Sequence, residues 1–101
     1  MAREQFQTLT EPMYYILLAL LEECCGVDIM EKVNALSHGR VQVGPGTLYA
    51  MLARFESNHI VRLTASNGRK KSYIITDTGR EMLIKEFQRL ETMVKDGSPY
   101  L

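Results

Sequence analysis

One stretch of this chain restricts its fold more than any other: residues 43–63, VGPGTLYAMLARFESNHIVRL, and, two residues later, SNGRKKSYIIT. The Gly44-Pro45-Gly46 cluster breaks helices, and the apolar residues after it recur at helical spacing. Two runs of β-type residues then flank Asn67-Gly68, the strongest short signal for a β-hairpin. This order predicts a helix that starts near Thr47, a strand, a turn with three adjacent cations, and a returning strand.

The order helix, strand, basic turn and strand is typical of a winged helix. Further helices are expected at about residues 11–23, 27–36 and 77–96, with Gly26 ending the first of them. Val41 and Val43 alternate with Gln42 as a short edge strand would. The expected fold class is mainly α with a small β-hairpin. It is a winged helix-turn-helix of residues 1–78 followed by a C-terminal dimerisation helix of residues 79–101, both in one structural unit.

Two helices carry more apolar surface than the chain itself can cover. Residues 13–21 are apolar on every side of their helix, so this helix must be covered on more than one side. The last helix has a heptad-like seam, which indicates a dimerisation helix. The alternative is that this helix packs back on the first helix of its own chain. The expected dimer interface consists of Met13, Tyr14, Leu17, Leu83, Phe87, Leu90 and Val94.

The charge of the chain is divided between two regions. Lysine and arginine together number 12, as do aspartate and glutamate, so the formal net charge is zero. Residues 40–80 contain seven of the cations and two of the anions, which leaves five cations and ten anions elsewhere. A basic region of this kind is the electrostatic footprint of a nucleic-acid-binding protein. The alternative is an ordinary mixed surface with an uneven distribution.

Several residues of the basic region have the chemistry needed to contact duplex DNA. A recognition helix enters the major groove with its amino-terminal residues foremost, and Thr47 and Tyr49 offer a hydroxyl and a phenol there. The adjacent cations of the hairpin repel each other, and binding to a polyanion releases counterions. Exposed cations also prevent edge-to-edge pairing of hairpins, which is the alternative explanation. The candidate DNA-binding residues are Pro45, Gly46, Thr47, Tyr49, Arg54, Arg69, Lys70 and Lys71.

Three segments, LTEPMYYILLAL, GPGTLYAMLARFE and GRKKSYIITDTGRE, together resemble the PadR family of winged-helix transcriptional regulators. The likeness extends from Leu9 to about Val94 and includes the spacing K-x-Y-x-x-T-x-x-G, residues 71–79. The resemblance implies a homodimer in which the last helix crosses the first helix of the partner. It also implies repression of neighbouring genes and DNA contacts by the third helix and the hairpin cations.

Within that family this chain resembles the short subgroup, which has one helix after the winged helix. Some members of the subgroup bind flat aromatic drugs at the dimer centre, where a tryptophan stacks on the drug. This chain has no tryptophan, which argues against that kind of recognition. The residues that line a cleft for a small apolar or aromatic effector would instead be Tyr14, Tyr15, Phe87 and Met93. Each of them is also suited to interface packing.

The sequence contains no pattern typical of an enzyme, a cofactor site or a metal site. His38 and His59 have no carboxylate at a telling spacing, and we interpret both as helix-end or surface residues. Cys24 and Cys25 are adjacent, which is unfavourable for a disulfide. We interpret them as thiols near a helix end, with a redox switch as the alternative. The longest apolar run has nine residues, short of the ~18 that span a bilayer, so a cytoplasmic protein without membrane contact is expected.

These observations predict a homodimeric repressor that binds a pseudo-palindromic site in double-stranded DNA and that is relieved, where an effector exists, by a small apolar or aromatic molecule. The main alternative is a winged-helix adaptor that binds proteins and never contacts DNA. A second alternative is a ligand sensor whose DNA binding is secondary, and a sensor and a repressor can coexist in one molecule.

Overall fold

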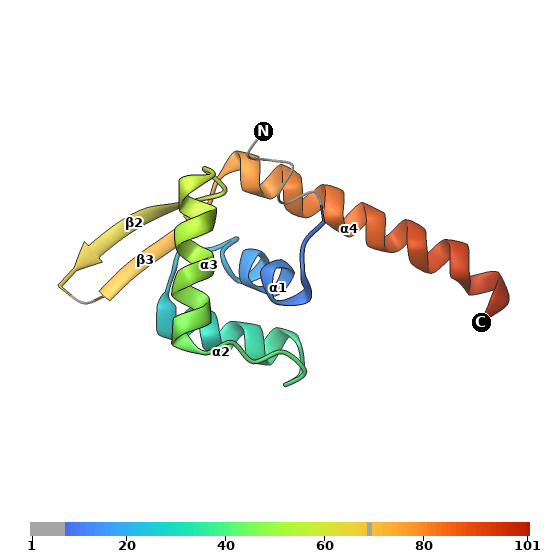
Figure 1. The fold of residues 1–101 in the computed structure, drawn as a ribbon, viewed down its shortest axis with the longest axis horizontal. Helices are drawn as coiled ribbons and strands as arrows, with labels where there is room; N and C mark the ends of the chain where they lie inside the picture. Colours follow the sequence, from blue (N-terminus) through green and yellow to red (C-terminus); the bar gives the residue numbers. More distant parts are fainter. Residues whose placement is uncertain (1–7, 69) are drawn as a thin grey trace.

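Three helices and a small sheet form the body of the molecule, and a fourth helix extends well beyond them, as Figure 1 shows. The structure is a computed structural model that describes residues 8–68 and 70–101. The elements are, in order, α1 (Glu11–Ala19), β1 (Cys24–Cys25), α2 (Gly26–Leu36), α3 (Pro45–Ser57), β2 (Val61–Asn67), β3 (Lys70–Ile75), α4 (Asp77–Gly97) and a 3-10 turn (Ser98–Tyr100). The fold is a winged helix with an added C-terminal helix, which confirms the predicted fold class.

The core lies where α1, α2 and α3 meet the sheet. Leu48, Leu52 and Phe55 lie on one face of α3 and are fully buried, as their helical spacing predicts. They pack in a single cluster with residues of α1 and α2, among them Ile16 and Ile29. Because this face of α3 packs into the cluster, the opposite face is exposed to solvent.

The sheet is antiparallel and has the strand order β1-β3-β2. Its first strand, β1, was missed by the sequence analysis. Cys24 pairs with Tyr73 and Cys25 with Ser72 of β3, so α1 ends at Ala19 and not near Glu23. A strand of two residues is too short to show any periodicity in a sequence.

Two other local expectations are corrected. Gly26 begins α2 and does not end α1. The valines at 41 and 43 belong to no strand, because the Val41 N–H donates to the buried hydroxyl of Ser37 at 3.0 Å instead of to a neighbouring strand. Val41 itself is buried in the core, which explains the apolar residue without a strand.

The hairpin formed by β2 and β3 is the wing, and in Figure 1 it extends away from the body on the side opposite the end of α4. Asn67 pairs with Lys70, so Asn67 belongs to β2 and not to the turn that the Asn-Gly pair indicated. Gly68 has a φ of +63°, a conformation that glycine adopts without steric cost. Residue 69 lies outside the described residues.

The junction between the wing and α4 is held by one side chain. The Thr76 hydroxyl caps α4 by accepting the Gly79 N–H at 3.0 Å. It also donates to the carbonyl oxygen of Ile60, the residue directly before β2, at 2.9 Å. A β-carbon at Gly79 would lie 2.2 Å from the same carbonyl, so only glycine fits here. The start of α4 is therefore fixed to the loop between α3 and β2.

Only the first half of α4 packs on the body. Gly79, Leu83 and Glu86 are buried, whereas the side chains beyond Leu90 are exposed. Among the helices of residues 8–68 and 70–101, none is both long enough and apolar enough to cross a membrane.

Candidate nucleic-acid interface

The start of α3 presents bare backbone at the surface. Leu48 donates the first intrahelical hydrogen bond, to the Gly44 carbonyl at 2.9 Å, so the N–H groups of Gly46 and Thr47 precede the helical ladder. Pro45, Gly46 and Thr47 are exposed. A β-carbon at Gly44 or Gly46 would meet no atom within 4 Å. The fold itself does not require glycine at either position, and the result is a surface that another backbone can approach closely.

Tyr49 and Arg54 also lie on solvent-exposed faces of α3. Tyr49 is 42% exposed and its ring leans across α3 toward the start of α2, because its phenol occupies the space next to Gly26. Arg54 is in the last turn of the helix, where a cation stabilises the negative end of the helix dipole.

The wing presents its lysines close to this helix. Lys70 and Lys71 are both exposed, and among the residues that the structure describes neither takes part in an ion pair. The third predicted cation, Arg69, lies outside the described residues. Two unpaired ammonium groups on a protruding hairpin have no stabilising role within the chain, and they raise the local concentration of an anionic partner.

A hollow of about 250 Å³ joins the two elements. Tyr49 of α3 and Lys70 and Lys71 of the wing line one side of it, and residues 25–27 at the start of α2 line the other. The third helix and the cations of the wing therefore share one surface of the molecule. We call the surface formed by residues 45–49, Lys70 and Lys71 the wing flank.

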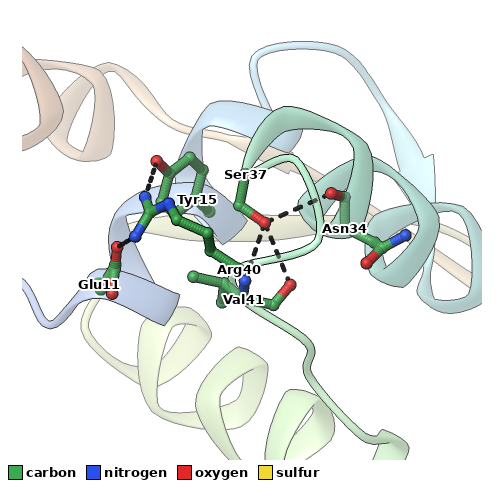
Figure 2. A network of polar contacts seen from close by, with 6 residues as sticks. All are labelled: Glu11, Tyr15, Asn34, Ser37, Arg40 and Val41. Carbon is green, nitrogen blue, oxygen red and sulfur yellow. Dashed lines mark hydrogen bonds and ion pairs between the residues drawn. The ribbon is translucent and has the colours of Figure 1, made fainter.

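Arg40 does not belong to the wing flank, although it counts toward the basic region of the sequence. As Figure 2 shows, its guanidinium turns toward α1, where it donates to Glu11 Oε2 at 2.5 Å and to the Tyr15 hydroxyl at 2.9 Å. The hydrogen bond that Arg40 donates to Glu11 and the negative charge of Glu11 raise the pKa of Arg40. In the same view the buried Ser37 hydroxyl holds Val41, so the turn that leads into α3 is fixed at both places.

The two cysteines face different surroundings because successive side chains of a strand point to opposite sides. Burial raises the pKa of Cys24, with the charge of Lys32 acting in the opposite direction. The Cys25 thiol donates to Asp28 Oδ2 at 3.3 Å. Both thiols are free and buried, and packing of the β1 strand accounts for them.

A comparison with known proteins shows which family this chain belongs to. The sequence model of the family described as "Transcriptional regulator PadR-like family" matches residues 16–85, more than half of the chain. This chain belongs to that family. The resemblance predicted from its motifs is thereby confirmed, and with it the general function of a DNA-binding transcriptional regulator.

One curated relative of this PadR-like chain is described as an uncharacterized 37.1 kDa protein in transposon TN4556 of Streptomyces fradiae. The two are 42% identical over 84 residues, which is 75% of this chain and 24% of that protein. The PadR-like chain therefore spans about a quarter of the relative's length.

Solved structures show the same fold. A transcriptional regulator from Clostridium thermocellum superimposes with a TM-score of 0.73 at 21% identity, over 90% of this chain and 94% of that one. A PadR family transcription regulator from Clostridium difficile R20291 gives 0.68 at 24% identity, over 86% and 96%. RosR of H. salinarum gives 0.66 at 22% identity, over 92% and 96%. At these identities the likeness concerns the fold.

The second notable surface of the PadR-like chain is formed by α1 and α4, and we call it the helix flank. Large apolar side chains are exposed along α4: Ile84, Phe87, Met93 and Val94 are 49%, 50%, 55% and 69% accessible. A hollow of about 240 Å³ between α1 and α4 is lined mainly by apolar residues, among them Tyr14, Leu18 and Phe87. Exposed apolar surface of this extent is typical of a protein interface.

Three residues of the predicted dimer interface are corrected to core positions. Met13, Leu17 and Leu83 are buried within their own chain. The first half of α4 packs back on the body. The alternative that this helix packs on its own chain therefore holds for that half. Tyr14 and Leu90 are half-buried, and Phe87 and Val94 are exposed; for these four the interface stays a prediction.

In the described part of the single chain, the four predicted effector-cleft residues line no common hollow, and a cleft at a dimer centre stays a prediction. Tyr14 and Tyr15 line a hollow of about 300 Å³ together with Glu86, Arg89 and residues around them, and their rings meet edge to face at 5.7 Å. Phe87 lies in the neighbouring apolar hollow, where Tyr14 is again a wall. Met93 is farther along α4, where its sulfur accepts from Arg89 Nη1 at 3.0 Å.

One buried carboxylate on α4, that of Glu86, was not among the residues that the sequence predicted for any site. Glu86 is 3% exposed. It accepts from Arg89 at 2.6 and 2.9 Å and from the Leu9 N–H at 3.3 Å. The hydrogen bond from Arg89 lowers the pKa of Glu86 against the opposing effect of burial. Glu86 and Arg89 are three residues apart on one helix, but that spacing alone does not show which carboxylates are covered.

Proposed function

We propose that this PadR-like protein is a homodimeric cytoplasmic repressor that binds a pseudo-palindromic operator. Residues 1–78 would carry the DNA-binding surface and residues 79–101 the dimer contacts. The hollow that joins Tyr49 to Lys70 and Lys71 is the observation that carries the proposal, because it aligns the exposed start of α3 with unpaired cations of the wing. A helix that enters the major groove needs such cations on the adjacent phosphates.

Each part of the wing flank has a role in the proposal. Thr47, at the exposed start of α3, would contact base edges, and the backbone at Pro45 and Gly46 would approach the sugar-phosphate chain. Lys70 and Lys71, with Arg69 next to them in the sequence, would neutralise phosphates. Arg54 would contact the flanking backbone.

The exposed apolar surface of α4 supports the dimer. Phe87 and Val94 are seven residues apart and so lie on one side of the helix. A second copy of the chain would cover them, together with the exposed parts of Tyr14 and Leu90. Two recognition helices would then lie about one DNA turn, ~34 Å, apart.

Relief by a small effector is a second function that the helix flank supports. The hollows beside Tyr14 have apolar walls and a few polar groups, the composition of a small-molecule site. An apolar or aromatic compound seated there would contact α1 and α4, the two helices on which dimer geometry depends.

The alternative of a protein-binding adaptor is separated from DNA binding by salt dependence. We suggest fluorescence anisotropy with a labelled duplex that carries the DNA upstream of the protein's own gene, at several salt concentrations. Lys70→Gln/Lys71→Gln should weaken binding to this duplex and to random duplex alike. It should also flatten the salt dependence by about one slope unit for each phosphate that is no longer neutralised.

The matched control is Lys85→Gln/Lys95→Gln, which removes the same charge from exposed positions of α4 and should leave the slope unchanged. An adaptor would show weak binding with equal slopes for all three proteins. That result would overturn the proposal.

A further inference from the structure

Gly26 has a role that the sequence analysis did not assign. A β-carbon at this position would lie 2.2 Å from the Tyr49 hydroxyl oxygen and 2.8 Å from Tyr49 Cζ. Gly26 is the first residue of α2, and its φ lies outside the left-handed region. Glycine at position 26 therefore leaves the space that the Tyr49 ring occupies, and a β-carbon would displace that ring.

The contact with Gly26 determines where Tyr49 points. The phenol lies over the start of α2 and toward the wing, so its hydroxyl faces the same hollow as Lys70 and Lys71. Within residues 8–68 and 70–101, this hydroxyl takes part in no hydrogen bond. A side chain that projected straight out from α3 would reach into a groove, whereas this one lies along the protein surface beside the wing.

Three residues that line the hollow, Tyr49, Lys70 and Lys71, carry groups that can donate hydrogen bonds. Each lysine ammonium offers only donors, and the phenol offers a donor as well. Three donors at one opening, two of them cationic, match the oxygens of a single phosphate. On the wing flank the source of such a phosphate is the DNA backbone.

We infer that the hollow seats one backbone phosphate of duplex DNA, and that Gly26 is the positioning residue that keeps Tyr49 at this seat. The inference rests on the proposed function and refines it. It assigns Tyr49 to the DNA backbone, so that Thr47 is left to contact base edges, and it makes Gly26 part of the DNA-binding machinery although Gly26 itself is buried.

The direct test replaces single phosphates of a bound operator with uncharged methylphosphonates, one at a time, after the operator has been selected from random duplex DNA by the wild-type protein. Wild-type protein should lose about three- to tenfold in affinity at the seated phosphate of each half-site. With Tyr49→Phe, which removes the hydroxyl alone, the loss at that phosphate should shrink, while losses at other phosphates should stay as they are.

The role of Gly26 is tested with Gly26→Ala. Its β-carbon should displace the Tyr49 ring and lower affinity for operator and random duplex by the same factor, about three- to tenfold. Gly97→Ala is the matched control, because a β-carbon at Gly97 meets only the Leu101 Cδ1 atom at 3.9 Å. Since both changes act on one contact, Gly26→Ala/Tyr49→Phe should bind no more weakly than Gly26→Ala alone.

The inference fails if Tyr49→Phe reduces affinity for operator while leaving random duplex unaffected, since that pattern belongs to a base contact. It also fails if no methylphosphonate position responds to Tyr49→Phe, or if the two substitutions act additively. The Tyr49→Phe experiments keep the inference testable should Gly26→Ala fail to fold. Failure of the proposed function is distinct, because wild-type protein would then select no duplex at all.

Discussion

The wing flank and the helix flank differ in whether their cations are paired with carboxylates and in how much apolar surface they expose. On the helix flank the cations Arg40 and Arg89 are each bonded to a carboxylate of the same chain, while large apolar side chains are uncovered. On the wing flank, in the described part of the chain, Lys70 and Lys71 have no acidic partner, and the large exposed hydrophobic side chain is that of Tyr49. Uncompensated charge and uncovered apolar surface suit different partners, a polyanion and another protein.

The largest effect should come from adding charge to the apolar surface of α4. Phe87→Asp/Val94→Asp should yield monomers with a normal circular dichroism spectrum, because both side chains are exposed in the single chain. Sedimentation should show the change of mass. A monomer reaches one half-site at a time, so operator affinity should fall on the order of a hundredfold.

Gln88→Asp/Thr92→Asp adds the same charge at exposed polar positions of α4, and it should leave the assembly state unchanged. An intact dimer after Phe87→Asp/Val94→Asp would show that the helix flank is not the dimer surface. The assignment of the two flanks to different partners would then be wrong.

A smaller effect concerns the buried carboxylate of the helix flank. Its pKa is lowered in the folded protein, so its contribution to stability is present at neutral pH and is lost as the pH falls from about 4.3, the unfolded value, through the folded pKa. Glu86→Gln should reduce the free energy of unfolding by about 1 kcal/mol at pH 7. The difference from wild type, measured by urea denaturation, should shrink below pH 4. A difference that grows in acid would show that this carboxylate is not held in its charged form.

The smallest expected effect is that of Arg40→Gln on DNA binding. Arg40 lies five residues before α3 in the sequence, but its guanidinium is bonded to α1. Operator affinity should change less than about twofold, and the salt slope should match that of wild type. If anisotropy titrations give a slope that is lower by about one unit, Arg40 contacts a phosphate and belongs with the lysines of the wing flank.

Much of the fold could be predicted from local patterns. The buried stripe of α3 and the hairpin each depend on residues within a few positions of one another, so spacing and residue type were sufficient. The strand β1 could not be predicted, because its two residues form a strand only by pairing with β3, far along the chain. The Asn-Gly pair alone did not show where β2 ends, for a similar reason: the end of β2 depends on the register of the two strands.

The candidate sites show the same limit. Periodicity placed Leu83 and Val94 on the same seam of α4, but it gives an angle around the helix and not the point where the body of the protein ends. Leu83 is therefore core and Val94 is exposed. Gly26 was interpreted as a helix stop, since nothing in the sequence links it to Tyr49, 23 residues later. Contacts between elements, on which the short strand β1 also depends, were out of reach.

The Thr76 junction has a consequence for how such a protein adapts to new operators. Because the beginning of α4 is bonded to the loop between α3 and β2, a residue inserted later in α4 leaves the DNA-binding surface untouched. It turns the remainder of the helix by about 100° and advances it by about 1.5 Å. In the proposed dimer, the distance and the twist between the two half-sites would then change in fixed steps with the length of one helix, independently of the bases that are read.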